Sequence, residues 1–233
     1  MMCRFFIIVF SILFSFPSEA QDTINRSDQW GKKQGFWRKV DSLGQKIYEG
    51  QFRDGIPYGE FLYYYPSGSI KTRSIISDQG KVARVITCFP NGKKMASGIY
   101  IQEKRDSIWQ FFSDYDGSLV SEERYSAGIK QGISNTFYPD GILAETVSWV
   151  NGKREGIWEQ YFTDGKIKLR GNFKEDEKEG PFLIFFLNGK TMLSGQYRHG
   201  HQHGLWIFYS ETGKILKKET FENGKLLKTE EFK

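Results

Sequence analysis

Residues 156–180, GIWEQYFTDGKIKLRGNFKEDEKEG, contain one copy of the unit that decides the fold. Two segments of this unit, Ile157 to Phe162 and Lys166 to Lys174, are rich in aromatic and β-branched residues. The turn FTDG (162–165) separates them, and its glycine accepts a positive φ without strain. Two short apolar segments around a glycine turn predict a β-hairpin.

The same unit recurs along the chain with a period of 24 residues. The turn glycine stands at positions 44, 68, 92, 117, 141, 165, 189 and 213, and every step is 24 except one of 25. A column of small residues precedes the turn glycine by nine positions, or ten in one case: Gly35, Gly59, Ala83, Ser107, Gly132, Gly156, Gly180 and Gly204. An internal period of this length is typical of repeat proteins.

Aromatic residues follow the same period in three columns. The first column, two residues after the small one, reads Trp37, Phe61, Val85, Trp109, Ser134, Trp158, Phe182 and Trp206. The second column, five residues after the small one, reads Val40, Tyr64, Cys88, Phe112, Phe137, Tyr161, Phe185 and Tyr209. The third column, eight residues after the turn glycine, reads Phe52, Ile76, Tyr100, Tyr125, Trp149, Phe173, Tyr197 and Phe221. Hairpins that stack in register would therefore bring these rings together.

We predict an all-β protein, in which about eight stacked hairpins pair edge to edge as one elongated antiparallel sheet. A single hairpin is marginal in water, and burial of one Phe or Trp side chain contributes about 1.5–3 kcal/mol. The first and second aromatic columns have opposite parity on an ideal strand. Either both faces of the sheet carry aromatic side chains or a β-bulge shifts the register, and the sequence leaves both possibilities open.

These repeats divide the chain into three regions. We predict a signal peptide at residues 1–20, an N-terminal segment at 21–30 and a repeat domain at 31–233. The repeats lie near residues 31–55, 56–79, 80–103, 104–128, 129–152, 153–176, 177–200 and 201–224, followed by a C-terminal cap. We expect residues 226–233 to supply a last strand that covers the open edge of the sheet.

The first twenty residues, MMCRFFIIVFSILFSFPSEA, have the pattern of a cleavable secretory signal. Arg4 is followed by an apolar segment, Phe5 to Phe16, that is too short to cross a bilayer as a helix. An N-terminal membrane anchor is the alternative. Cleavage would remove Cys3 and leave Cys88 as the single cysteine, so no internal disulfide is expected. We expect no transmembrane segment in the mature chain, and export to the periplasm, the outer membrane or the medium.

Composition narrows the class of protein further. Of 233 residues, 39% are hydrophobic and 16% aromatic, which is too apolar for a disordered chain. A mean hydropathy of −0.52 excludes a polytopic membrane protein. The net charge of +5 is a mild basic excess rather than a dense basic patch, so we expect no nucleic-acid partner.

Residues 48–59, YEGQFRDGIPYG, resemble the MORN repeat, and the 24-residue unit resembles the bacterial MORN-variant family. Many members of that family carry the label of an antitoxin of the YwqK type. The resemblance implies an elongated sheet of stacked hairpins and a binding module for proteins or, in some cases, phospholipids. The chain departs from the pattern at Ala83, Cys88, Ser107 and Ser134, so we expect repeats 3 to 5 to be the least regular.

Few residues suggest catalysis. Cys88 is a conceivable nucleophile, but its column otherwise holds Tyr, Phe and Val, which favours a small core residue. Gly189, Lys190 and Thr191 resemble the end of a P-loop, but the upstream glycine is missing. The repeated acids Asp140 and Asp164 belong to turns, which argues against paired catalytic carboxylates. We therefore expect no enzyme, no cofactor and no catalytic residue.

The sharpest chemical feature is the cluster His199, His201 and His203. Alternate histidines on a strand share a face and could bind zinc or copper. The cluster aligns, however, with the polar connections between other repeats, and the only further ligand candidates are Glu155 and Glu179. We expect no metal site, although the sequence leaves this question open.

Two sets of aromatic residues are candidates for contact with a partner. The tryptophans of the first column could line a groove that stacks on sugars or grips a peptide, although periodicity favours a place in the core: Trp37, Trp109, Trp158 and Trp206. The aromatic residues beside them are better candidates for an exposed patch: Tyr63, Tyr65, Phe111, Phe162 and Phe208. The charge runs 175–179 and 214–218 are expected to be solvated surface.

We conclude that the sequence predicts an exported, non-catalytic interaction scaffold at the cell envelope, with a protein or another envelope component as its partner. A module that binds a glycan or an anionic lipid surface is the first alternative, motivated by aromatic residues interleaved with lysines. An antitoxin-like protein that neutralises a partner is the second. The sequence does not identify the partner or the face of the sheet that binds it.

Overall fold

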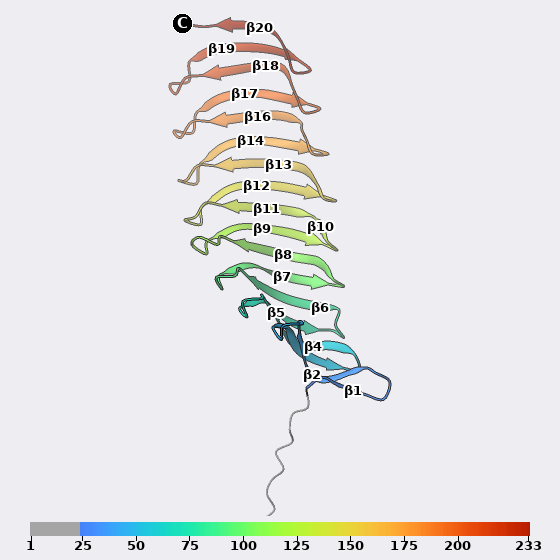
Figure 1. The fold of residues 1–233 in the computed structure, drawn as a ribbon. Coiled ribbons are helices and arrows are strands. Elements are labelled where there is room, and N and C mark those ends of the chain that lie inside the picture. The colour runs from blue at the N-terminus through green and yellow to red at the C-terminus, as the bar shows by residue number, and fades with distance from the viewer. Residues whose placement is uncertain (1–23) are drawn as a thin grey trace, which may run out of the picture.

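A computed structural model describes residues 24–233 of the chain, so the predicted signal peptide lies outside the described residues. The described chain contains no α-helix and forms a 20-stranded antiparallel sheet. The hairpins stack into an elongated ladder that runs from the N-terminal to the C-terminal end (Figure 1). The predicted all-β fold of stacked hairpins is confirmed. In residues 24–233, no helix is long and apolar enough to cross a membrane.

The strands are short and follow one another along the chain. They are β1 (Arg26–Ser27), β2 (Lys33–Val40), β3 (Lys46–Arg53), β4 (Ile56–Tyr64), β5 (Ile70–Ser77), β6 (Val82–Cys88), β7 (Lys94–Ile101), β8 (Lys104–Phe112), β9 (Leu119–Ser126), β10 (Ile129–Lys130), β11 (Gly132–Phe137), β12 (Leu143–Val150), β13 (Lys153–Tyr161), β14 (Ile167–Lys174), β15 (Glu177–Lys178), β16 (Gly180–Phe185), β17 (Thr191–Arg198), β18 (His201–Tyr209), β19 (Ile215–Glu222) and β20 (Lys225–Glu231).

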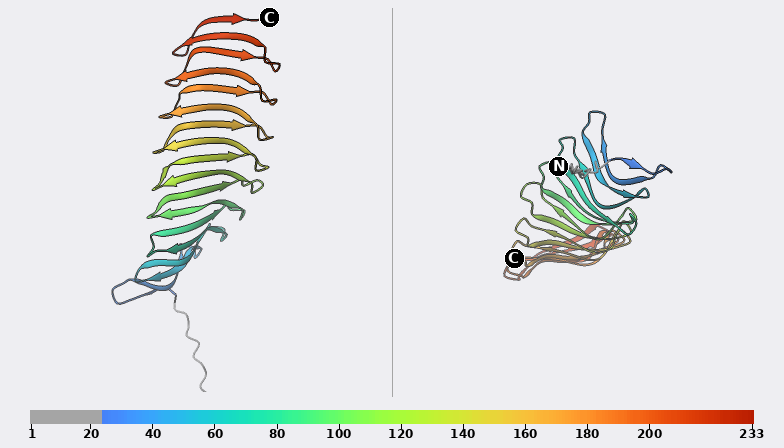
Figure 2. Two further views of the ribbon diagram at one scale, coloured as in Figure 1. Left: turned by 180° about the vertical axis from the view of Figure 1, so that it is seen from behind. Right: turned by 90° about the horizontal axis from the view of Figure 1, so that it is seen from below.

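The main strands pair in the order of the chain, each with the one before it and the one after it. The two-residue strands β10 and β15 pair only with β9 and β14, so β11 pairs with β9 and β16 pairs with β14. At the two ends, β1 pairs with β2 and β20 pairs with β19, so short segments of the chain cover the outermost hairpins. The axes of the antiparallel strands from β7 to β20 are nearly aligned with one another, whereas the axes of the N-terminal strands are rotated relative to them (Figure 2).

Two kinds of turn connect the strands. Within a repeat, the Gly68 amide donates to the carbonyl of Tyr65 at 2.8 Å, and equivalent bonds recur at the other turn glycines. Between repeats, most connections are two-residue turns such as Asp54 and Gly55, with φ of 52° and 81°. Positive φ at both positions is the signature of a type I′ turn, whose twist matches that of the flanking strands.

β-Bulges determine which face each aromatic column occupies. In the first hairpin, Lys39 pairs with Tyr48, but Val40 pairs with Lys46, so β3 carries one extra residue. In each hairpin, the side chains of the first strand alternate regularly between the two faces of the sheet near the turn. The extra residue of the bulge lies on the second strand. As a result, the first and second aromatic columns lie on opposite faces. The two possibilities that the sequence left open are therefore both realised: both faces carry aromatic side chains, and a β-bulge shifts the register.

We call the two sides of the sheet the ring face and the aliphatic face. The ring face carries the first and third aromatic columns, and the aliphatic face carries the second. Most of the buried apolar side chains belong to the ring face, including Phe61, Trp109 and Trp206, the last only 1% exposed. The core of this single-layer protein therefore lies on one surface of its own sheet.

The irregular repeats keep their strands but change their details. Ser107 occupies the small column with φ of 61°, and the turn from Ser113 to Ser118 accommodates the additional residue of that repeat. Ala83 does not adopt a positive φ, and β5 and β6 pair without a register shift. In the second repeat, Gly59 and Glu60 form a bulge and have no partner on β3. The third repeat has no bulge at the equivalent place, and its connection between Ser77 and Val82 is longer instead.

Candidate functional site

On the ring face, four glycines lie directly beneath aromatic rings of neighbouring strands. They are the glycines with ordinary negative φ: Gly50, Gly98, Gly171 and Gly195. A Cβ atom at Gly98 would lie 2.4 Å from the Trp109 ring. Gly50, Gly98 and Gly195 are needed for space rather than for turn geometry, because the ring lies against the backbone itself, whereas a Cβ atom at Gly171 would lie 3.2 Å from the nearest ring atoms.

The rings of the ring face contact one another from repeat to repeat. The centroids of Tyr100 and Trp109 are 4.9 Å apart with their planes at 72°, and those of Tyr197 and Trp206 are 5.2 Å apart at 86°. Edge-to-face packing of this kind adds about 0.5–1.5 kcal/mol per pair to the burial of area. The rings form a continuous ladder in the C-terminal half of the sheet.

A row of cations runs along one side of this ladder. Its members stand two residues before the small column: Lys33, Lys81, Arg105, Lys130, Arg154 and Lys178. The Lys33 ammonium lies 4.6 Å from the Trp37 centroid, and the Lys178 ammonium lies 4.9 Å from that of Tyr197. Cation–π contacts of this kind hold most of the row over the rings.

The ladder is interrupted in the third repeat. Val85 stands where most other repeats have a ring, and Ser74 stands opposite it, in the column that holds a glycine in four of the eight repeats. Both residues are buried. A hollow of about 630 Å³ opens above them, within the range of small-molecule sites. The hollow is a direct result of small side chains in two strands of the ring face.

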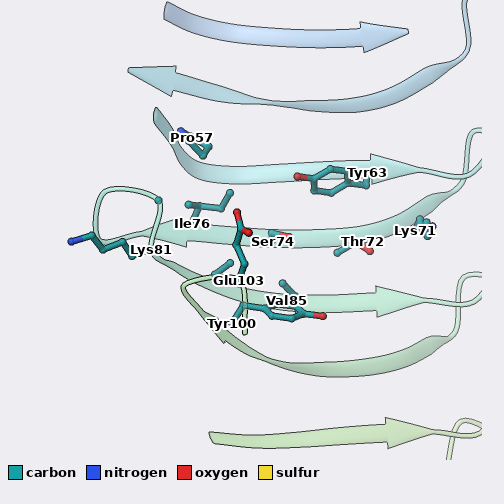
Figure 3. Close-up of a pocket in the computed structure, with 12 residues that line it drawn as sticks. Pro57, Tyr63, Lys71, Thr72, Ser74, Ile76, Lys81, Val85, Tyr100 and Glu103 are labelled. Carbon is teal, nitrogen blue, oxygen red and sulfur yellow. The ribbon is translucent and has the colours of Figure 1, made fainter. Parts of the chain in front are cut away.

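Figure 3 shows the floor and the walls of this hollow. Thr72, Ser74 and Val85 form the floor, while Tyr63 and Tyr100 stand on opposite sides. Burial, and to a lesser extent the neighbouring Tyr48, raise the pKa of Tyr63, so its phenol stays protonated at neutral pH. Charged groups complete the rim: Lys71, Lys81 and Glu103.

The aliphatic face carries a second feature, a row of half-exposed aliphatic side chains. It consists of Ile108, Ile133, Ile157 and Leu205, which are 45%, 53%, 50% and 47% exposed. All four occupy the same place in their repeats, which are the fourth, fifth, sixth and eighth. Pro181 holds this place in the seventh repeat. Hollows of about 470 and 420 Å³ flank Ile108 on this face.

Acidic residues on the aliphatic face are held by neighbouring cations and phenols. The buried Glu49 accepts hydrogen bonds from Tyr64 and, at 2.5 Å, from Arg38. Burial opposes ionisation of Glu49, but these bonds and the charge of Lys46 outweigh it and lower the pKa of the carboxyl. Glu159 has a similar environment with Tyr161 and Arg170. These groups are structural anchors on the surface of the sheet.

The histidine cluster does not converge on one point. His199 lies in a turn with φ of 48°, and its backbone N–H donates to Glu179 Oε2 at 2.8 Å. Glu155 accepts the backbone N–H of Glu175 at 2.8 Å in the same way. Glu155 and Glu179, the two carboxylates considered as further ligands, thus each accept a backbone N–H from the turn between the next two repeats. Among residues 24–233, no group of three or more His, Cys, Asp or Glu side chains could hold a metal ion.

The other candidates for chemistry occupy structural positions. Cys88 is half-buried at the end of β6, and its carbonyl accepts the Tyr65 hydroxyl at 2.8 Å. Gly189 and Lys190 lie in a hairpin turn, where Gly189 donates its N–H to the carbonyl of Phe186. This turn precedes a strand rather than a helix, so it lacks the strand-to-helix setting of a P-loop.

The predicted aromatic surfaces divide differently. Trp109 and Trp206 are buried and Trp37 and Trp158 half-buried, so this column belongs mainly to the core. Of the five residues expected to be exposed, only Tyr63 is; the others are half-buried: Tyr65, Phe111, Phe162 and Phe208. Sequence reasoning missed the row of cations and the aliphatic row, although both repeat at fixed positions in the 24-residue unit.

Comparison with known families identifies part of the array. Three segments of the chain match the MORN repeat variant. They are residues 57–74, 154–175 and 202–223, which lie in the second, sixth and eighth repeats. MORN repeats are in general modules that bind proteins or membranes. The matched MORN-variant segments lie outside the third to fifth repeats, where the aromatic columns are least complete.

Several solved structures show a limited likeness. A TarM mutant of S. aureus in complex with fondaparinux, α-GlcNAc-glycerol and UDP is 15% identical, with a TM-score of 0.32 over 52% of this chain and 21% of that chain. A second TarM structure is 16% identical, with a TM-score of 0.31 over 52% and 20%. The Tc holotoxin pore of Photorhabdus luminescens is 10% identical, with a TM-score of 0.22 over 81% and 13%.

The chain spans about a fifth of the length of the TarM chains that it matches. TM-scores this low support no inference about fold or function. No curated protein matches the chain.

Proposed function

We propose that this protein is an exported, non-catalytic scaffold that binds another protein at the cell envelope. The observation that carries the proposal is the aliphatic row on an open sheet face. Its four half-exposed side chains, Ile108, Ile133, Ile157 and Leu205, stand at the same place in the fourth, fifth, sixth and eighth repeats. Aligned apolar side chains on an open surface are typical of a protein-interaction site.

The dimensions of the row suit an elongated partner. Neighbouring repeats are two strand spacings apart, or about 10 Å, so the row from Ile108 to Leu205 covers about 40 Å. Polar residues that pair with the row, such as Arg124 and Asn172, provide hydrogen-bonding groups around it. An apolar line with a polar border resembles the arrangement found in reversible protein interfaces.

Export is supported by the sequence of residues 1–20, and the absence of catalysis is proposed because the sequence offers no convincing nucleophile, base or metal cluster. A scaffold of this kind would act by presenting a long surface. An antitoxin-like role, in which the bound protein is neutralised, is a special case of the same binding.

Affinity capture from envelope extracts tests this proposal. The protein and the double variant Ile133→Ser/Ile157→Ser should be compared, with Leu187→Ser as the control, because Leu187 is equally exposed but lies in a turn away from the row. We expect the same partner with the unaltered protein and with Leu187→Ser, and its loss with the double variant. Repeated failure to recover any partner, or equal recovery by all three proteins, would overturn the proposal.

A second candidate function is favoured by the cation row on the ring face. The third to seventh repeats each carry one cation of the row, and this spacing of about 10 Å would suit a glycan or lipid surface that carries regular negative charge. Sedimentation with anionic vesicles and with peptidoglycan at low salt tests this alternative. Binding that decreases as salt is added would support it, and no binding at low salt would exclude it.

A further inference from the structure

The cation row and the ring ladder together form a unit that recurs on the ring face. In the fourth repeat, the Arg105 guanidinium carbon lies 4.7 Å from the centroid of Trp109 and 5.5 Å from that of Tyr125. In the first repeat, the Lys33 ammonium lies 4.6 Å from the centroids of both Trp37 and Phe52. The unit consists of one cation and two rings, taken from the first and third aromatic columns.

The third repeat contains this unit without its central ring. Lys81 stands at the cation's position in the sequence and Tyr100 supplies the ring of the third column, but the first-column residue is Val85. Lys81 lies in the connection between Ser77 and Val82 and its ammonium points outward (Figure 3), so a ring bound in the hollow would draw it inward. In the part of the chain that the structure describes, no ring lies within cation–π distance of Lys81, and Lys81 forms no ion pair. The third repeat therefore contains both a cation that contacts no ring, Lys81, and a first-column position that holds no ring, Val85.

The space for that ring is present. The hollow of about 630 Å³ lies over Ser74 and Val85, and Lys81 and Tyr100 both line it (Figure 3). The fifth repeat also lacks a ring, at Ser134, but there Glu123, Lys130 and Trp149 lie together on the same face. The third repeat is thus the place where the ladder is interrupted by an open hollow.

We propose that this hollow binds a tryptophan side chain of the partner protein, which supplies the missing ring and extends the ladder across the third repeat. The inference rests on the proposed function, since it assumes a protein partner. An indole fits better than a phenyl ring because Trp has the strongest attraction for a cation such as Lys81. The hydroxyl of Tyr63 and the carboxylate of Glu103 line the hollow and offer acceptors for the indole N–H.

Nuclear magnetic resonance titration tests the site without knowledge of the partner. The probe is N-acetyl-tryptophanamide, added to ¹⁵N-labelled protein while the amide signals of Lys81, Val85 and Tyr100 are followed. N-acetyl-leucinamide is the apolar control, and methyl glucoside represents a glycan. We expect saturable shifts at these residues with the tryptophan probe and none with the other two. The inference would be overturned if only the glucoside caused saturable shifts, or if none of the three probes did.

Variants locate the binding within the hollow. Lys81→Ala should weaken binding of the tryptophan probe about fivefold, because it removes one cation–π contact. Lys225→Ala, at an exposed lysine near the other end of the sheet, should leave binding unchanged. An equal effect of the two substitutions would contradict a role for Lys81.

The double variant Ser74→Gly/Val85→Trp would rebuild the ladder from within. It should fill the hollow, abolish binding of the probe and raise the melting temperature. If this variant does not fold, the Lys81→Ala comparison still decides the question. Capture of the same partner by the folded double variant would refute the ring site and leave the scaffold proposal intact. Probe binding without any protein partner would instead refute the scaffold and leave a site for an indole.

Discussion

Gly195 on β17 lies so close beneath the indole of Trp206 on β18 that a Cβ atom at Gly195 would be 2.3 Å from Trp206 Cδ2. Trp206 is the most buried large side chain among the described residues, although no second layer of structure covers it. The indole is buried because it lies against the backbone of the neighbouring strand and between the rings of Tyr197 and Phe182. The close approach of Gly195 and Trp206 thus shows how a single sheet forms a core.

Replacement of Gly195 by alanine should destabilise the protein by about 1–3 kcal/mol, the usual cost of overpacking. Gly171→Ala is the matched control, because a Cβ there would lie 3.2 Å from the nearest ring atoms and requires only small shifts. Urea denaturation monitored by circular dichroism measures both. We expect Gly195→Ala to lose clearly more stability than Gly171→Ala, and equal losses would show that the ring contact is not the cause.

Replacement of Glu179 by alanine should cost about 1 kcal/mol, because the N–H of His199 then loses its acceptor. Glu179→Gln should retain most of the stability, since Gln131 accepts the N–H of Asn151 in the equivalent place at 2.8 Å. Thermal unfolding of the three proteins checks this expectation. If both variants melt at the same temperature, the side chain contributes through something other than this hydrogen bond.

Protonation of Glu49 should destabilise the protein in acid. Burial raises the pKa of this carboxyl, but hydrogen bonds from Tyr64 and Arg38 lower it below the ordinary value of 4.5. The unfolded chain therefore binds a proton more readily, so the stabilisation is present above about pH 4.5 and is lost as pH falls through the folded pKa. Denaturant midpoints measured from pH 7 to pH 3 should fall less steeply for Glu49→Gln than for the unaltered protein.

The matched control for this measurement is Glu60→Gln, at an exposed carboxylate that pairs with Arg73. Its pH profile should follow that of the unaltered protein. An identical slope for Glu49→Gln and the unaltered protein would mean that the Glu49 cluster makes no contribution to acid sensitivity.

Zinc should not bind to the histidine cluster. His199 lies in a turn, while His201 is exposed on β18 and His203 carries a buried Nδ1 atom. The nearest carboxylate candidate, Glu179, is already engaged with a backbone N–H. Isothermal titration of micromolar protein with zinc chloride is expected to show no heat beyond dilution. A saturable heat that disappears in His201→Ala would establish a metal site and overturn this expectation.

The repeat itself could be predicted from the sequence because its causes are local. Turn glycines such as Gly165 are set by backbone conformation, and apolar segments such as 157–162 are set by strand preference, so both recur with the 24-residue period. Pairing of neighbouring hairpins follows, since each needs the next to bury its rings. The MORN resemblance was visible for the same reason.

The faces of the sheet were decided only by the tertiary structure. The shift between Lys39 and Val40 depends on how β2 pairs with β3, and strand alternation alone does not contain that information. The hollow likewise requires that Ser74 and Val85, on different strands, lie opposite one another on the ring face. The hairpins and their stacking follow from the amino-acid sequence alone, because they depend on residues that are close together in the chain. Which side chains share a face, and where that face is left open, depended on the register between strands, which is settled only when the strands pair.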